Sequence, residues 1–275
     1  MNNFLKVFRY VFIHTSLWLA FGAAGVAFMT FVVLQSALKI EAILIAFLAT
    51  FFLYNLNKKT DIIEDSINYP ERVKFIKTYG NALFIIGIFS YIIAAFLALF
   101  NNLITFLITL TPFILTFLYS VMRLKKLFLI KDAIVPLGWS MTPLLVISYI
   151  SFNPIFFIIP LFIFSRSFII TICYDTKDTT GDTMQGIKTI PSIYGIAFTK
   201  KILYILNILF FLIISSLSIF LNLYLLIPLA VIVSIYSIYY VSFIEKINIK
   251  NICEIISGGE YILLGVISYI LWVLI

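Results

Sequence analysis

Residues 81–121 read NALFIIGIFSYIIAAFLALFNNLITFLITLTPFILTFLYSV and contain no Asp, Glu, Lys or Arg. A helix needs about 20 mostly apolar residues to cross the hydrocarbon core of a bilayer. This stretch is long enough for two crossings, and the Asn101-Asn102 pair marks a tight turn between them. The segment therefore predicts a hairpin of two membrane-spanning helices.

The rest of the chain has the same character. Hydrophobic residues make up 63% of the 275 and charged residues 11%, whereas a soluble domain is about half apolar and a quarter charged. Apolar runs broken by charge, Asn or Pro predict nine spans, at residues 8–35, 40–57, 81–100, 102–121, 133–150, 154–174, 202–221, 223–243 and 258–275. We expect an all-α membrane protein with about nine transmembrane helices, folded as a single domain over residues 1–275.

The N-terminus and the cysteines argue against two other interpretations. Lys6 and Arg9 precede an apolar run that is too long for a signal-peptide core and lacks a small-residue cleavage site, so we interpret it as a retained first helix. Cys173 and Cys253 lie far apart in the sequence, with no C-x-x-C or Cys/His spacing near them. Neither a disulfide framework nor a zinc site is expected.

Basic residues predict the orientation. Of the 19 Lys and Arg residues, 17 lie in the N-terminal segment or in the longer connections that follow the even-numbered spans. The positive-inside rule then places the N-terminus and these loops in the cytoplasm and the C-terminus outside. Because this topology accounts for the net charge of +7, we expect a lipid bilayer as the partner and no nucleic acid.

Acidic residues gather on the same side, although the positive-inside rule makes no demand on them. Eleven of the 12 lie there, and Glu41 is the exception. Residues 55–72 read NLNKKTDIIEDSINYPER, and residues 174–191 read YDTKDTTGDTMQGIKTIP. If the helices before them continue past the hydrocarbon boundary, each stretch presents a polar stripe on one helix face. The stripes consist of Asn57, Asp61 and Asp65, and of Asp175, Asp178 and Asp182.

These stripes are better explained by a bound cation than by helix stability, because like charges at this spacing repel by roughly a few tenths of a kcal/mol. Carboxylate oxygens favour magnesium or calcium. Mg²⁺ takes one or two carboxylates and completes its shell with water and phosphate oxygens, and no EF-hand pattern indicates calcium. We therefore expect Mg²⁺, bound by the five carboxylates of Asp61, Asp65, Asp175, Asp178 and Asp182.

Basic residues follow each acidic stripe. Arg72 follows the first and Lys188 the second, and the loop after residue 121 adds Arg123, Lys125 and Lys126. Carboxylates, magnesium and basic side chains together form a diphosphate clamp. Such a clamp also neutralises the charge that develops on a diphosphate leaving group. A solvated membrane rim is the alternative, but it would scatter its charges.

At these residues the sequence resembles the UbiA superfamily of intramembrane prenyltransferases. The family's first signature, N-x-x-x-D-x-x-x-D running into N-x-P-x-R, is matched by Asn57, Asp61, Asp65, Asn68, Pro70 and Arg72. Its second, D-x-x-D-x-x-x-D followed by G-x-K-T-x-P, is matched by Asp175, Asp178, Asp182, Gly186, Lys188, Thr189 and Pro191. A third element, a Tyr followed by basic residues, is similar to Tyr119 with Arg123, Lys125 and Lys126. The layout of nine spans agrees over the whole chain.

The resemblance implies a ring of nine helices around a lipid-accessible cavity, with the acidic loops capping its cytoplasmic end. It implies Mg²⁺-dependent transfer of a prenyl group from an isoprenyl diphosphate to an acceptor, with the prenyl chain in an apolar, aromatic interior. The implied substrate-binding residues are Asn57, Arg72, Tyr119, Arg123, Lys125, Lys126 and Lys188. The acceptor stays open among aromatic acids, tetrapyrroles and lipid-pathway intermediates.

One departure from the family concerns the first signature. Lys58 and Lys59 follow Asn57, where the family often has another Asp, and this changes how a first metal would be held. The loop after residue 121 offers three basic residues, Arg123, Lys125 and Lys126, as candidates for contact with the diphosphate. Lys131 and Asp132 are further candidates for the same site.

Two other functions are compatible with acidic residues in a membrane protein. A carrier that binds a divalent cation or a lipid diphosphate without chemistry would have its acids and broken helices near the bilayer midplane. An alcohol phosphatidyltransferase would resemble a contiguous D-x-x-D-G and A-R block, which this sequence lacks. The boundary position of the acids favours the prenyltransferase over both.

Two polar residues inside predicted spans have open roles. His14 is the single histidine, and it contacts substrate or lies at the membrane interface. Arg166 lies about two turns before Asp175, so it either reaches the cavity or extends its guanidinium to the membrane edge.

Overall fold

The computed structural model describes residues 3–245 and 249–274. Across these residues, nine helices have 14 or more residues. They are α2 (Leu17–Val33), α3 (Ile40–Thr60), α5 (Pro70–Asn101), α6 (Leu103–Thr116), α7 (Ile130–Ile150), α8 (Ile158–Met184), α10 (Ile196–Phe220), α11 (Leu226–Ser242) and α13 (Glu260–Leu274).

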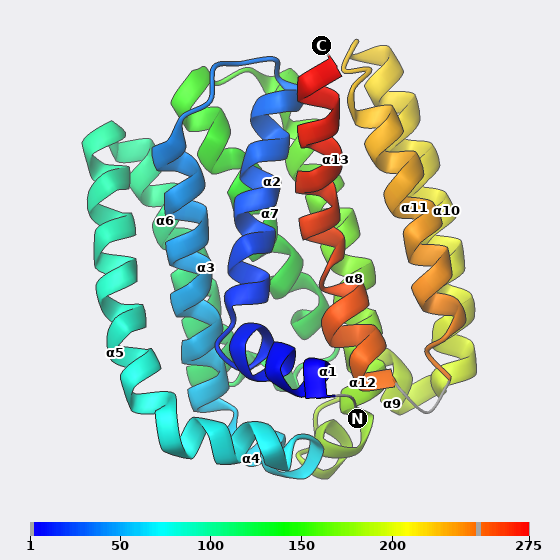
Figure 1. Ribbon diagram of the computed structural model, residues 1–275. Coiled ribbons are helices and arrows are strands. Elements are labelled where there is room, and N and C mark those ends of the chain that lie inside the picture. Colours follow the sequence, from blue (N-terminus) through cyan, green and yellow to red (C-terminus); the bar gives the residue numbers. More distant parts are fainter. Residues whose placement is uncertain (1–2, 246–248, 275) are drawn as a thin grey trace.

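Shorter elements join or extend these helices. The α-helical ones are α1 (Asn3–Phe8), α4 (Ile62–Asn68), α9 (Ile190–Tyr194) and α12 (Ile249–Asn251). The 3₁₀ and π turns are η1 (Arg9–Ile13), η2 (Phe117–Val121), η3 (Leu124–Lys126), η4 (Pro154–Phe157) and η5 (Ile252–Ser257). Figure 1 shows α1, α4, α9 and α12 at the same end of the bundle, and the C-terminal end of α13 at the other.

The long helices form a closed ring. Contacts run from α2 to α3, α5, α6, α7, α8, α10, α11 and α13 in turn, and α13 returns to α2. Helices α2 and α7 also contact one another across the interior of the ring (Figure 1). The chain therefore encloses its interior with helices that follow one another in sequence.

The number of membrane crossings is not confirmed as nine. Among the described residues, seven helical segments are long and apolar enough to cross a bilayer, and the bent pair Leu5–Ile13 with Leu17–Val33 would make eight. Helix α11 is apolar but has 17 residues, at the short end of the usual range for a span. All nine predicted segments are helical, and the chain is a multi-pass membrane protein.

The first predicted span begins later than the sequence indicates. A bend of 66° separates residues 5–13 from α2, because Ser16 adopts a left-handed backbone conformation with φ of 69°. At the bend, the backbone carbonyls of Ile13 and His14 accept hydrogen bonds from the buried Lys58 Nζ of α3, at 2.5 and 3.2 Å. The apolar run that starts at residue 8 is thus divided into a short helix across the bundle end and a membrane helix.

Local chemistry explains the other helix ends. Asn102 separates α5 from α6, and its side chain accepts a hydrogen bond from Thr105 N at 2.8 Å, which caps α6. Pro70 begins α5, since a proline needs no backbone donor at a helix start. Helix α8 ends where Gly186 takes a φ of +70°. The α8 helix therefore extends ten residues beyond the predicted boundary at 174, as the acidic stripe required.

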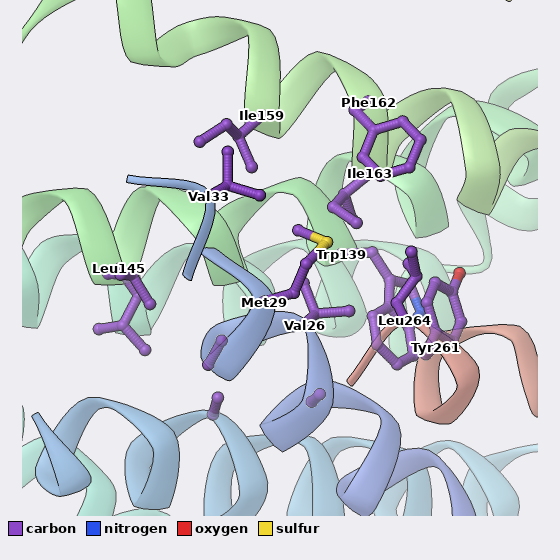
Figure 2. Packing of buried hydrophobic residues seen from close by; sticks show 14 of the residues in the cluster. Val26, Met29, Val33, Trp139, Leu145, Ile159, Phe162, Ile163, Tyr261 and Leu264 are labelled. Carbon is purple, nitrogen blue, oxygen red and sulfur yellow. The ribbon is translucent and has the colours of Figure 1, made fainter. Parts of the chain in front are cut away.

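The interior of the ring is filled by apolar side chains from α2, α7, α8 and α13. Val26 and Met29 of α2 are fully buried and lie between Ile163 of α8 and Leu264 of α13 (Figure 2). Beside them the rings of Trp139 and Tyr261 stack with centroids 3.8 Å apart. Trp139 and Tyr261 of this layer also line a cavity inside the ring.

The ring closes through two glycines. A Cβ added at Gly265 of α13 would lie 2.7 Å from the Cα of Gly25 on α2. We expect Gly265→Val to separate these helices and to destabilise the protein by about 1 to 3 kcal/mol, the usual effect of overpacking. The measurement is the thermal unfolding midpoint in detergent.

The matched control for this variant is Gly138→Ala, because a Cβ at Gly138 meets no atom within 4 Å. It should leave the midpoint unchanged or raise it. Equal midpoints for Gly265→Val and the wild type would contradict the close contact between α2 and α13.

Candidate active site

A cavity of about 280 Å³ opens inside the ring, bordered by α2, α3, α6, α7 and α8. Its walls change character along their length. At the end near α4 they carry acidic and basic side chains from both signature stretches and from η5. Further inside they are apolar and aromatic, with Ile45, Ala49, Leu145, Tyr54 and Trp139. The cavity therefore suits a molecule with a charged head and an apolar tail.

The first signature does not continue as one straight helix. Helix α3 ends at Thr60, and Asp61 has φ of −97° and ψ of 19°. The helical hydrogen bonds Asp61 N to Asn57 O and Asp65 N to Asp61 O persist through this point, while α4 turns to run across the end of the bundle (Figure 1). Asn57, Asp61 and Asp65 therefore do not share one face of a straight helix, as the spacing predicts. They follow the bend from α3 into α4 and line the cavity.

Each residue of the first stripe has a defined partner. Lys125 Nζ donates to Asp61 Oδ1 at 2.6 Å, and Arg72 Nη1 donates to Asp65 Oδ2 at 3.1 Å. Asn57 Oδ1 accepts a hydrogen bond of 2.7 Å from the Ser120 hydroxyl. All three signature residues line the cavity, and so do Arg72 and Lys125.

The second stripe lies along α8, as the sequence predicts. Lys131 Nζ lies 2.7 Å from Asp175 Oδ1 and 2.8 Å from Asp182 Oδ2, so one lysine joins the two ends of the stripe. Asp178 accepts a hydrogen bond of 2.6 Å from the Tyr69 hydroxyl and pairs with Lys177 at 3.1 Å. The five carboxylates predicted as metal ligands therefore face the same cavity.

A direct contact joins the two signatures. The Asn68 amide accepts a hydrogen bond from Gly181 N at 3.1 Å and donates to Asp178 O at 3.3 Å. A Cβ at Gly181 would lie 2.3 Å from Asn68 Nδ2, so a larger residue would displace the Asn68 side chain from this contact. Asn68 thus fixes the distance between the acidic stripes.

Tyr69, which lies between Asn68 and Pro70 in the first signature, is a buried hydrogen-bond donor. Burial, with the Asp178 and Glu254 carboxylates nearby, raises the pKa of its phenol well above the ordinary value. The hydroxyl therefore stays protonated at neutral pH and donates to Asp178. Its ring also lies 3.9 Å beneath the Arg72 guanidinium, a favourable cation–π geometry.

Not all of the predicted substrate-binding residues reach the cavity. Tyr119 lines it, with its ring 6.0 Å from Lys125 Nζ. Arg123, Lys126 and Lys188 are exposed and lie outside its walls. Of the three basic residues after residue 121, the structure selects Lys125, which is 3% exposed.

Sequence reasoning missed several residues that the structure places in the cavity wall. Lys177 carried a signal, since it lies within the second signature. Lys131 was not missed, because it was named with Asp132 as a candidate, and it lines the cavity. Lys58 stands where an acid is common in the resembled family, yet its ammonium is bound to the backbone at the bend before α2. Glu254 of η5 had no signal, because nothing in its local sequence distinguishes it from an ordinary boundary charge.

The donor set at the polar end fits a divalent cation with a phosphate. Six carboxylates and five basic side chains line the cavity, and the described residues contain no group of three acidic, His or Cys side chains that would enclose a metal without help. Mg²⁺ prefers this situation, since it takes one or two carboxylates and shares substrate phosphate oxygens. The basic side chains can contact the phosphate oxygens that remain.

Comparison with known proteins agrees with this geometry. A homologue of UbiA from Archaeoglobus fulgidus, solved with DMAPP and Mg²⁺, is 17% identical and superposes with a TM-score of 0.72 over 97% of this chain and 100% of that chain. An apo UbiA homologue from Aeropyrum pernix K1 is 11% identical, with a TM-score of 0.67 over 93% and 97%. A digeranylgeranylglyceryl phosphate synthase is 20% identical, with a TM-score of 0.58 over 97% of each chain. These similarities show the shared fold.

A comparison with curated protein sequences finds no match. The model of the UbiA prenyltransferase family, in contrast, matches residues 13–252. These residues include both acidic signatures and every carboxylate that lines the cavity except Glu254, which lies just beyond the match. Sequence pattern, fold and cavity thus point to the same family. The chain belongs to the UbiA prenyltransferase family.

Proposed function

We propose that this protein transfers a prenyl group from an isoprenyl diphosphate to an acceptor inside the membrane. The observation that carries the proposal is the cavity, which begins among paired carboxylates and basic side chains and continues between apolar and aromatic walls. Structures of similar fold bound to DMAPP or GPP with Mg²⁺ support it. The cavity shape matches a diphosphate head and an isoprenoid tail.

In this proposal the polar end holds Mg²⁺ and the diphosphate together. The metal would be held by the carboxylates of Asp61, Asp65, Asp175, Asp178 and Asp182, which line one cavity. Because the six carboxylates and five basic side chains nearly balance, a diphosphate has to enter with compensating positive charge. Bound Mg²⁺ supplies that charge and stabilises the leaving diphosphate.

Side chains of the protein would bind the phosphate oxygens, orient the carboxylates and stabilise the reacting carbon. Arg72 and Lys125 would contact phosphate oxygens, and Lys131 bridges Asp175 and Asp182 so that both stay oriented toward the cavity. The carbon–oxygen bond to the diphosphate breaks and its electron pair leaves with the diphosphate. The allylic carbon then bonds to the acceptor, which releases a proton to the departed diphosphate or to water. The aromatic side chains of Tyr54 and Trp139 line the cavity interior, where aromatic rings can stabilise positive charge on that carbon.

We also propose that the polar end faces the cytoplasm, because the positively charged connections lie at that end. The acceptor is then a molecule that reaches the cavity from the bilayer or from the cytoplasmic surface. The exposed Arg123, Lys126 and Lys188 have no part in this proposal.

The test is transfer of radiolabelled prenyl diphosphates of several lengths by purified protein, onto a lipid extract and a panel of aromatic acids. We expect label in a new lipid-soluble product with Mg²⁺, and a loss of at least about a hundredfold when EDTA removes the metal. Calcium in place of magnesium is the control for nonspecific charge neutralisation. Binding of the diphosphate without product under every condition would indicate a carrier instead.

A further inference from the structure

The buried carboxylate of Glu254 on η5 is a centre of charge that no signature includes. It is 3% exposed and lies in the cavity wall. Its two oxygens accept charged hydrogen bonds from different segments, Oε1 from Arg72 and Oε2 from Arg9 of η1. The ammonium of Lys177 lies 4.0 Å from Oε1. One carboxylate thus gathers three cations from three parts of the chain.

Two of these cations have a second acidic partner. Arg72 also binds Asp65, and Lys177 also binds Asp178, each at 3.1 Å. Asp65 and Asp178 are among the carboxylates proposed above as metal ligands. The same carboxylate oxygens cannot bind a basic side chain and Mg²⁺ with full strength at once, since both compete for their lone pairs.

Resting on the proposed function, we propose that Glu254 is a positioning residue that keeps Asp65 and Asp178 available for metal. When Asp65 and Asp178 turn to Mg²⁺, Glu254 stays as the anionic partner of Arg72 and Lys177. A buried cation left without a partner is costly, so these two side chains would otherwise hold on to Asp65 and Asp178. The carboxylate therefore lowers the Mg²⁺ concentration that the site needs.

The surroundings of Glu254 agree with a positioning role. Arg72 rests on the ring of Tyr69, whose hydroxyl bonds to both Lys177 at 2.7 Å and Asp178 at 2.6 Å. Arg72 and Lys177 thus each contact both Tyr69 and Glu254. Their charged groups can remain in place while the acids beside them change partner.

The experiment measures the Mg²⁺ midpoint for binding of radiolabelled geranyl thiolodiphosphate, an unreactive analogue, to the purified full chain in detergent. We expect Glu254→Gln to raise this midpoint by about tenfold, the effect of losing one hydrogen bond to a charged group. Glu254→Asp should return it toward the wild-type value. The matched control is Glu245→Gln, because Glu245 pairs with Lys200 outside the cavity and is 44% exposed.

A merely structural role predicts a different result. It would lower the thermal midpoint or the amount of folded protein while leaving the Mg²⁺ midpoint of the folded fraction unchanged, and that outcome overturns the inference. If Glu254→Gln does not fold, the double variant Arg9→Gln with Glu254→Gln takes its place, because it also removes one cation that would lack a partner. We expect the same rise in the Mg²⁺ midpoint for this double variant. Wild-type protein that binds no analogue with Mg²⁺ would overturn the proposed function itself.

Discussion

Asp178→Ala is expected to lower prenyl transfer by on the order of a thousandfold at saturating substrate. A bound metal contributes several kcal/mol to stabilising a leaving group, and each 1.36 kcal/mol changes the rate tenfold. The Asp178 carboxylate lies in the cavity wall and accepts hydrogen bonds from Tyr69 and Lys177, and its backbone carbonyl accepts one from Asn68. Loss of its carboxylate removes a proposed ligand and releases two partners at once. The measurement is the rate of product formation from radiolabelled geranyl diphosphate.

Asp61→Ala should cause a loss of similar size, because its carboxylate is the partner of Lys125 on the opposite wall. The matched control is Glu41→Ala, since Glu41 is an exposed acid in the first turn of α3, at the other end of that helix. If either cavity variant keeps a tenth of the wild-type rate, the residue it replaces is not a metal ligand.

The second large effect concerns stability. Arg166 of α8 is fully buried and forms a two-pronged ion pair with Glu260 of α13, at 2.6 and 3.0 Å. Its Nη1 donates to the Asn207 side chain at 2.7 Å, and Nη2, which also donates to Glu260, donates to Val233 O at 3.2 Å. Tyr240 donates to Glu260 at 3.0 Å. This network joins α8, α10, α11 and α13 beside the cavity and not within it.

We expect Arg166→Met to destabilise the protein by about 3 to 5 kcal/mol, because it leaves the Glu260 charge buried without a cation. Arg166→Met with Glu260→Met should recover most of this loss, since removing both charges leaves neither unpaired. Thermal unfolding in detergent measures the effect. Transfer by the folded fraction of the single variant should stay close to the wild-type rate, and a selective loss of activity would contradict a purely structural network.

The sequence predicted those features that repeat along the chain. Nine apolar segments became nine helices because burial in lipid requires every backbone group to be bonded within its own segment. The acidic stripes converged because they end helices at the same face of the bundle. Asp175, Asp178 and Asp182 kept their predicted common helix face, as α8 continues to Met184.

The features that were not predictable depend on single partners remote in the chain. Arg166 was expected either to reach the cavity or to extend to the membrane edge, and it does neither, because its partner Glu260 lies 94 residues away. His14 lies buried at the bend after η1, beside the ring of Phe75 and outside the cavity. Cys173 and Cys253 are in contact, with sulfur atoms 3.6 Å apart, although both are free thiols. No local pattern encodes such pairings.

The bend at Asp61 shows a different reason for a wrong expectation. Helical spacing places Asn57, Asp61 and Asp65 on one face only while the helix axis stays straight. The backbone hydrogen bonds continue through Asp61, but its dihedral angles turn α4 across the bundle end. The contact between Asn68 and Gly181 holds that turn in place, and this contact forms only after α8 has been added.

The closure of the ring between α2 and α13 has a consequence for biosynthesis. Helix α2 ends at Val33, and its glycine contact on α13 lies at Gly265. At roughly 5 to 20 residues per second, the ribosome needs on the order of 10 to 45 seconds to reach α13 after completing α2. During that interval α2 lacks its neighbour α13, so the ring cannot close and the charged end of its cavity stays open on one side. Insertion machinery that shields this open edge until the last helix arrives would raise the yield of folded protein.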